Sequence, residues 1–262
     1  MIQSVSRPFP QALAPLGFTP NVTGGHMARS MMFNEIEVLQ SALPLDTTPP
    51  DYKYAIEQQN ILAKPTQSSR QKSYRHLVEL YGLDPSLVIF RTMRRLGQEA
   101  PGDLPLLAML CTYCRDLQLR RSFELIQKLP PGEHLTRERM EEHLEVSFPD
   151  QFSAAMKKSL AQNVNTTWTA SGHLEGRSKK IRAIPRSGWA SSTFAMFLGY
   201  LLGLRGQILL SSDFGKLVAL EPAQLVAHLQ TASTKGWLRL RHGGGVTEID
   251  FSELEHSHPE NI

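Results

Sequence analysis

The chain has 262 residues, of which 41% are hydrophobic and 20% charged, and this composition excludes global disorder. No uncharged apolar stretch reaches the roughly 18 residues that a membrane span requires. The beginning of the chain lacks the basic and apolar pattern of a secretory signal. Because Cys111 and Cys114 are the only cysteines, no disulfide framework is expected. We therefore expect a soluble, cytoplasmic protein that has no membrane partner.

The formal net charge of +3 conceals two basic segments. Residues 61–100 contain seven lysines and arginines against three acidic residues, and residues 151–190 contain seven against one. Clustering of this kind indicates a polyanionic partner, since a surface shaped by solubility alone would intersperse the two signs. The alternative is that each segment is a solvated face of a helix.

The chain is predicted to consist of two helical parts between an arm and a tail. Residues 1–22 are rich in proline and lack helical periodicity, so we expect an extended arm or a disordered tail there. Helices are predicted at 27–42, 84–98 and 103–129, and the last is apolar on nearly all sides and therefore buried. The turn Pro130-Pro131-Gly132 follows it. The predicted divisions are an arm at 1–22, an N-terminal helical domain at 23–130, a C-terminal helical domain at 131–252 and a tail at 253–262.

The first basic segment predicts a helix-turn-helix. Residues 51–60 and 66–81 have helical patterns and are joined by a tight link, and Gly82 closes the second helix. A short turn followed by a helix with a basic polar face is typical of this motif. The candidate DNA-binding residues of this helix are Arg70, Lys72 and Arg75.

The second basic segment predicts a winged helix-turn-helix. A helix at 135–146 is followed by a turn and by a helix at 154–168, which Ser153 caps. Two short strands, 173–175 and 180–184, then form a hairpin with a basic tip. The candidate DNA-binding residues are Lys157, Lys158, Asn165, Arg177, Lys179, Lys180, Arg182 and Arg186.

The carboxy-terminal part predicts helices at 192–204, 207–217 and 222–234, followed by a hairpin of residues 237–242 and 246–251. This unit has the element order of a further winged module, although its strands carry acidic as well as basic residues. We therefore expect a mainly α fold, a helical bundle with helix-turn-helix and winged-helix units and small β-hairpins.

The predicted motifs favour binding over catalysis. A helix fits the major groove, where base edges are distinguishable, and lysines and arginines neutralise phosphates. The alternative for each basic helix is an amphipathic helix packed on a bundle. The sequence has no phosphate-binding loop and no nucleophile elbow, and the pair of cysteines lacks the two further ligands of a zinc site. No enzyme activity, cofactor or metal is therefore expected.

Three groups of residues together carry a resemblance to a known family. The groups are Thr23-Gly24-Gly25-His26-Met27 with Met31, Met32 and Glu35; Asn60 to Thr66 with Arg70 and the run Tyr74-Arg75-His76-Leu77 to Leu80-Tyr81; and Asn163-Val164 with Trp168-Thr169, Ser171-Gly172-His173-Leu174. They resemble the BrxA family, the small accessory subunits of BREX phage-defence systems. The resemblance spans most of residues 20–252. It implies a helical protein with small hairpins that binds DNA without catalysis. It also implies partnership with larger BREX proteins, namely a methyltransferase, an ATPase and a phosphatase-like protein.

We therefore expect a non-catalytic, duplex-DNA-binding accessory protein of a BREX-like defence complex. One alternative is an assembly scaffold whose basic faces meet acidic proteins without contacting DNA. Another is a helical RNA-binding module, since a basic helical bundle also grips RNA. A DNA-processing enzyme is a more distant alternative.

Overall fold

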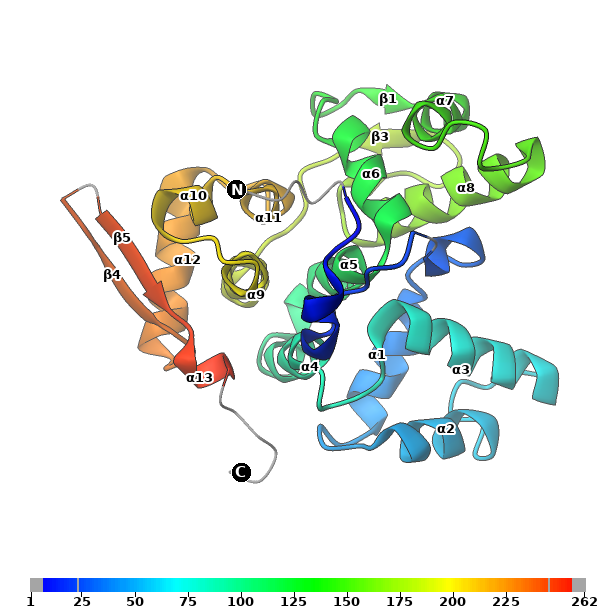
Figure 1. The fold of residues 1–262 in the computed structure, drawn as a ribbon, viewed down its shortest axis with the longest axis horizontal. Coiled ribbons are helices and arrows are strands. Elements are labelled where there is room, and N and C mark those ends of the chain that lie inside the picture. Colours follow the sequence, from blue (N-terminus) through cyan, green and yellow to red (C-terminus); the bar gives the residue numbers. More distant parts are fainter. Residues whose placement is uncertain (1–6, 23, 245, 256–262) are drawn as a thin grey trace.

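The computed structural model describes residues 7–22, 24–244 and 246–255, and its fold is mainly helical (Figure 1). Thirteen α-helices lie within these ranges, and they are α1 (Phe33–Ala42), α2 (Pro49–Glu57), α3 (Gln67–Tyr81), α4 (Val88–Glu99), α5 (Leu104–Arg115), α6 (Leu117–Ile126), α7 (Arg137–Ser147), α8 (Ala154–Ala170), α9 (Trp189–Leu201), α10 (Gly206–Leu210), α11 (Asp213–Leu217), α12 (Pro222–Thr234) and α13 (Ser252–Glu255). Three 3-10 helices are η1 (Gln11–Leu16), η2 (Gly25–Met27) and η3 (Pro101–Asp103). The expectation of a mainly helical fold with small hairpins is confirmed.

The strands form two small antiparallel sheets. The first contains β1 (His134–Leu135), β2 (Leu174–Glu175) and β3 (Lys180–Arg182) in the order β1-β3-β2, with Ile181 opposite both His134 and Glu175. The second is the hairpin of β4 (Arg239–Gly243) and β5 (Val246–Asp250). The first sheet joins β1 to the predicted hairpin, although residues 136–179 separate β1 from β3 along the chain.

Helix starts follow the capping residues that the sequence offers. The hydroxyl of Thr66 accepts a hydrogen bond from Ser69 N at the start of α3, and Ser153 accepts one from Met156 N at the start of α8. Thr136 caps α7 in the same way. Such caps satisfy backbone N–H groups that have no partner within the helix. The predicted starts of α3 and α8 are confirmed to within one residue.

The predicted long helix 103–129 is wrong, because the chain breaks at Asp116. The backbone there is extended, with φ −136° and ψ 112°, and its carboxylate caps α6 by accepting from Leu119 N. Helix α5 is nonetheless buried along almost its whole length, as expected. The buried side chains around it form one continuous cluster, from Phe9 near one end of the chain to Leu254 near the other. The division at Pro130-Pro131-Gly132 stays a prediction.

The predicted arm packs onto the core within the residues described. Phe9 and Phe18 are buried, with ring centroids 4.8 Å apart, and the Arg120 guanidinium lies 4.2 Å from the Phe9 ring centroid. Arg115 Nη1 donates to Gly17 O at 2.7 Å. The proline-rich composition concealed these anchors, so the expectation of an extended or disordered segment is wrong for this part. Residues 1–6 lie outside the described residues.

Several predicted elements have different bounds. The helix expected at 27–42 begins at Phe33 and is preceded by η2, and the helix expected at 207–217 is split into α10 and α11. Helix α12 agrees with its prediction, and the last hairpin forms, with Gly245 of its turn outside the described residues. Of the predicted tail, residues 256–262 also lie outside them. Among the helices described, none has the length and apolar character needed to cross a membrane.

Candidate nucleic-acid interface

Helix α8 lies at the centre of the second basic segment. Elements α6, β1, α7, α8, β2 and β3 follow one another, with α7 packed on α8 and the β2–β3 hairpin directly after it (Figure 1). The inward face of α8 carries Leu160, Val164 and Trp168, all fully buried, and Trp168 Nε1 donates to Ser122 Oγ on α6 at 2.8 Å. The helix is therefore anchored along one face, which leaves the opposite face for solvent or a ligand.

The outward face of α8 is small and polar. Ala155, Ser159, Gln162 and Thr166 are exposed at helical spacing, and Lys158 is exposed beside them. Side chains three or four positions apart share one face of a helix, so these five form one continuous stripe. Gln162 and Thr166 were not among the predicted contact residues. Their positions opposite the buried Val164 and Trp168 are the signal that could have identified them.

Two adjacent lysines on α8 have different surroundings. Lys157 Nζ forms an ion pair with Glu145 of α7 and is partly buried. Lys158 is exposed and forms no ion pair with a described acidic side chain, although, after a backbone hydrogen bond and the paired Arg137, its charge also helps to lower the pKa of Glu138 on α7. Lys158 is therefore the lysine of this pair that remains available to an anion.

The tip of the β2–β3 hairpin carries exposed cations. Arg177 and Lys179 are exposed, and no described acidic side chain forms an ion pair with either. Gly176 has φ +88°, and a Cβ there would collide with Lys179 O, so only glycine fits this tight turn. Lys180 Nζ donates to Gly176 O at 2.8 Å across the tip. Arg186, beyond the hairpin, is exposed as well.

Arg182 is partly buried and bonded to backbone carbonyls, and Asn165 is buried. The Arg182 guanidinium donates to Ile126 O and His173 O, each at 3.1 Å, and to Ala183 O. Burial lowers the pKa of Arg182. Asn165 is 5% exposed, and its Oδ1 has no hydrogen-bond partner. Asn165 lines a polar hollow of about 560 Å³ together with Gln162, Thr166, Arg177 and Lys180.

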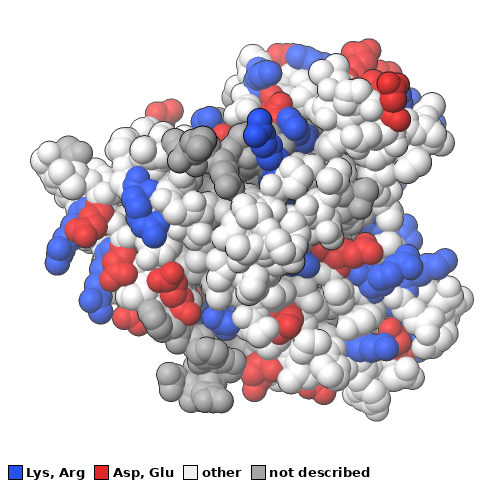
Figure 2. Space-filling model, viewed as in Figure 1, with Lys and Arg blue, Asp and Glu red and all other residues white. Residues whose placement is uncertain are grey.

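Helix α3 presents the first basic segment. Lys72 and Arg75 are exposed on the same face as Ser68 and Gln71, and Arg70 is partly buried. None of the three cations forms an ion pair with a described acidic residue. Figure 2 shows lysine and arginine side chains over α3 on the side that faces the lobe of α7 and α8, and the outline is hollowed between them.

The cations of neighbouring elements are neutralised within the protein. On α7, Arg137 forms ion pairs with Glu138 and Glu141, and Arg139 pairs with Glu133. Figure 2 shows acidic side chains in this lobe beside the basic ones. In the last hairpin, Arg239 pairs with Glu253 and Arg241 with Glu248. Several surface cations are therefore neutralised by nearby carboxylates, whereas those of α3, Lys158 of α8 and the β2–β3 tip are not. The exposed Arg29, Lys53, Lys128 and Lys235 likewise form no ion pair with a described acidic residue.

The 3-10 helix η2 joins the two basic segments. His26 is fully buried, its Nε2 lies 2.8 Å from Thr167 Oγ1 of α8, and its Nδ1 lies 2.9 Å from Asp116 Oδ2. On the other side, a Cβ on Gly25 would come within 2.7 Å of Leu80 of α3. A side chain on Gly24 would collide with Asp116. The two glycines therefore permit η2 to lie between α3 and α8.

The carboxylate of Asp116 is the polar centre of this junction. It accepts hydrogen bonds from His26 N at 2.8 Å and from Leu119 N at 2.9 Å. Burial acts to raise the pKa of Asp116, but the charge and hydrogen bonds of His26, with the Leu119 N–H, outweigh it and lower the pKa below its ordinary value. Sequence reasoning missed this junction, for which the adjacent Gly24-Gly25-His26 was the available signal.

Among the described residues, no group of three or more histidine, cysteine, aspartate or glutamate side chains is arranged to hold a metal ion. No protein-family model matches the chain, and no curated protein matches it in sequence.

Proposed function

We propose that the protein binds duplex DNA through α8 and the β2–β3 hairpin. The observation that carries the proposal is that the outward face of α8 and the hairpin tip directly after it both present cations without an acidic partner. Cations left unneutralised on adjacent elements supply the attraction to phosphates on which nucleic-acid affinity depends.

The order of elements supports a winged-helix unit from α6 to β3. In a winged helix, a first helix and strand are followed by two helices and a hairpin, and the strand nearest the chain's end lies between the other two. The order α6-β1-α7-α8-β2-β3 with sheet order β1-β3-β2 has this arrangement. In such a unit α8 is the helix that enters the major groove, and the hairpin is the wing.

The proposed contacts divide into two kinds. Lys158, Arg177, Lys179 and Arg186 neutralise phosphates, while Gln162, with Ser159 and Thr166, faces the base edges, where a glutamine side chain can bond adenine. Lys157 and Arg182 hold α8 and the wing in place, since their charged groups are bonded to Glu145 and to backbone carbonyls. Lys180 and Asn165 line the hollow between α8 and the wing.

Helix α3 supplies a second contact in this proposal. Helices α2 and α3 pack together, and Lys72 and Arg75 on the exposed face of α3 have no described acidic partner. We assign these two residues and Arg70 to the phosphates of the same duplex, in a helix-turn-helix formed by α2 and α3. Because η2 ties α3 to α8, the two contacts keep a fixed separation.

We also propose that the protein acts as a non-catalytic accessory component of a BREX-like defence complex. This part rests on the resemblance of its sequence to the BrxA family. It predicts co-purification with the methyltransferase, ATPase and phosphatase-like proteins of the complex when these are co-expressed. Failure of all three to co-purify would contradict the assignment to a BREX-like complex but would leave the DNA-binding proposal unaffected.

Fluorescence anisotropy with a labelled duplex tests DNA binding. We expect K158E/K179E to weaken binding by about 100-fold, because each reversal replaces an attraction to phosphate by a repulsion. R239E/R241E is the matched control, since it changes the net charge equally in the last hairpin, where both arginines are exposed and ion-paired. An equal loss in both variants would show that net charge, not this face, determines affinity, and would overturn the proposal.

Competition experiments separate the alternatives. Duplex RNA and single-stranded RNA of the same sequence should compete less well than duplex DNA, because the deep, narrow major groove of RNA does not admit a helix. Stronger competition by either RNA would favour the RNA-binding module. Co-purification of protein partners that survives both nuclease treatment and the K158E/K179E change, without DNA binding by the wild type, would favour the scaffold.

A further inference from the structure

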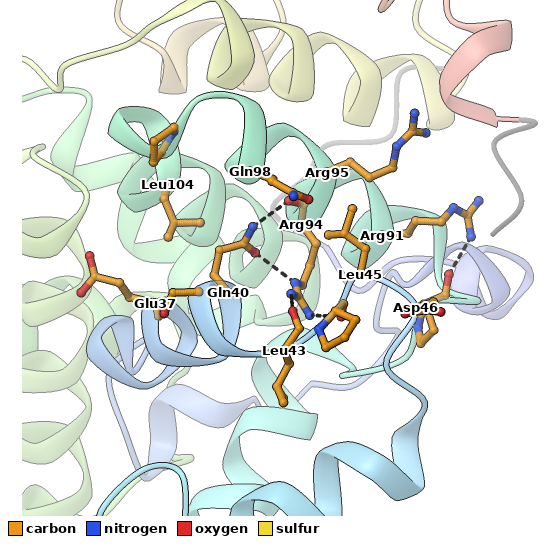
Figure 3. Close-up of a pocket in the computed structure, with 15 residues that line it drawn as sticks. Glu37, Gln40, Leu43, Leu45, Asp46, Arg91, Arg94, Arg95, Gln98 and Leu104 are labelled. Carbon is orange, nitrogen blue, oxygen red and sulfur yellow. Dashed lines mark hydrogen bonds between the residues drawn. The ribbon is translucent and has the colours of Figure 1, made fainter. Parts of the chain in front are cut away.

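A second hollow lies apart from α8 and the wing, between the end of α1, the loop that follows it, and α4. Its volume is about 670 Å³, which is within the range that small-molecule sites occupy. Figure 3 shows Gln40 of α1 and Leu43 of the loop facing Arg94 of α4, with Leu104 on the opposite wall from Arg91. The hollow is therefore lined by both apolar and cationic groups.

Arg94 forms a rigid floor for this hollow. It is 1% exposed and donates to Leu43 O at 2.6 Å, Pro44 O at 3.2 Å and Gln40 Oε1 at 3.0 Å, as well as to the hydroxyl of Tyr52. Gln40 Nε2 in turn donates a hydrogen bond to the backbone oxygen of Arg94 at 2.8 Å. Because Arg94 is saturated by the protein, it fixes the loop and has no need of a ligand.

Arg91 and Arg95 are not saturated in this way. Arg91 is 8% exposed, its Nη1 donates to Pro85 O at 2.7 Å and to Ser86 O at 3.3 Å, and its Nε is buried without a partner. Arg95 lies one turn further along α4, partly buried, with its guanidinium 5.0 Å from the Trp237 ring centroid. Burial and the neighbouring charge of Arg95 lower the pKa of Arg91.

The acidic groups near these arginines do not neutralise them. Glu37 and Asp46 also line the hollow, but neither forms an ion pair with an arginine, and Figure 3 shows Glu37 at the opposite end from Arg91. Glu99 favours the charged form of Arg95 without reaching ion-pair distance. Arg91 and Arg95, one turn apart on α4, thus have no carboxylate paired with them among the described residues. Such an arrangement is costly unless an anion compensates it.

We propose that this hollow binds an organic phosphate of mononucleotide size. Its phosphate would lie between Arg91 and Arg95, whose planar guanidinium groups can donate to two or more of its oxygens. Its flat or apolar body would lie against Leu45 and Leu104, which form apolar parts of the wall. The phosphate could belong to a free nucleotide or to the end of a nucleic-acid strand, and these share the same chemistry.

Isothermal titration of the full chain with AMP, adenosine and a 5′-phosphorylated trinucleotide tests this site. AMP should bind at least about tenfold more tightly than adenosine, which is about 1.4 kcal/mol, because adenosine lacks the phosphate. Binding of AMP identifies a free nucleotide as the source, and binding of the trinucleotide alone identifies a strand end. Measurable binding of AMP and adenosine with equal affinity, or no binding of either AMP or the trinucleotide at millimolar concentration, would overturn the proposal.

Variants distinguish this site from binding elsewhere. R95Q removes one cation that makes no hydrogen bond to the protein among the described residues, and S41W places a bulky side chain in the hollow from the exposed end of α1. Both should weaken AMP binding by roughly tenfold or more. R241Q, at a side chain that is 86% exposed, is the control and should bind as the wild type does. Wild-type AMP affinity in folded R95Q and S41W would overturn the proposal, and melting curves would verify that both fold.

Discussion

Helices α3 and α8 share a local pattern but differ in what surrounds them. Each begins at a hydroxyl cap and carries exposed cations that form no ion pair with a described acidic residue, namely Lys158 on α8 and Lys72 with Arg75 on α3. The β2–β3 hairpin follows α8 directly, whereas α3 ends at Gly82 and leads into the buried helix α4. A basic helix alone offers one row of contacts, whereas a basic helix beside a basic hairpin offers two. In the proposed interface we therefore assign the greater part of the DNA affinity to α8 and the hairpin, and a smaller part to α3.

The largest expected effect comes from breaking the junction that holds these two helices together. D116A removes the carboxylate that accepts from His26 N and Leu119 N and leaves these buried donors unpaired. We expect the free energy of unfolding to fall by about 3–5 kcal/mol. The partly exposed Asp213, which pairs with Lys216 at 3.2 Å, is the control, and D213A should cost under about 1 kcal/mol. Urea unfolding measures both, and equal losses would contradict a structural role for the junction.

A second prediction compares the two basic surfaces directly. K158E/K179E should weaken duplex binding by about 100-fold, and K72E/R75E, with the same change in net charge, by about tenfold. The difference follows from the hairpin, which in the proposed interface gives α8 additional phosphate contacts that α3 lacks. Anisotropy titrations at one salt concentration measure both variants. A greater loss in K72E/R75E would reverse the assignment and make α3 the main contact.

A third prediction concerns the buried end of α8. His173 is fully buried between Ser171 and Leu217 O, and burial, with the nearby charge of Arg182, lowers its pKa to about 3. Below about pH 6.5 the imidazole of His173 therefore takes up a proton in the unfolded chain but stays neutral in the folded protein. Stability should fall by about 1.4 kcal/mol per pH unit as the pH drops from 6 to 4.5.

The variant H173Q isolates this effect. The substitution lowers stability at every pH, but it should remove the His173 contribution to the slope between pH 6 and 4.5. Asp116 contributes at lower pH, since a lowered pKa delays its protonation until the pH falls below the ordinary range of a carboxylate. Urea midpoints across this interval measure the slope. An unchanged slope in H173Q would show that another group titrates there.

The smallest expected effect separates two adjacent lysines. K158Q should weaken duplex binding a few-fold, whereas K157Q should change it little, because Lys157 is already paired with Glu145. Each variant removes one positive charge from the same turn of α8, so net charge and helix propensity are matched. Equal losses would contradict the view that ion pairing within the protein decides which cations reach DNA.

Local patterns predicted most of the helices, because caps and 3.6-residue periodicity act over a few residues. Thr66, Ser153 and Pro222 marked the starts of α3, α8 and α12 as expected. The break at Asp116 was not predictable in this way, since its carboxylate is held by His26, ninety residues away in the sequence. The burial of Phe9 and Phe18 was not predictable for a similar reason, because the groups that they contact lie on distant helices.

The candidate site was predictable in part. The sequence identified the basic segments and the hairpin, whereas pairing across elements decides which cations remain available. Lys157 and Lys158 are neighbours in a uniform pattern, yet Glu145, twelve residues away, distinguishes them. Likewise the sequence predicts a helix around Arg91 and Arg95 but no binding site, because their lack of ion-pair partners is a property of the folded chain.

The salt dependence of duplex affinity tests the central claim most directly. The logarithm of the affinity should fall linearly with the logarithm of the salt concentration, with a slope of about 0.9 for each phosphate contact. The triple variant K158Q/R177Q/K179Q should therefore lower the magnitude of that slope by about 2.7 relative to the wild type. A slope that the triple variant leaves unchanged, or a wild type that does not bind duplex DNA at low salt, would contradict the account.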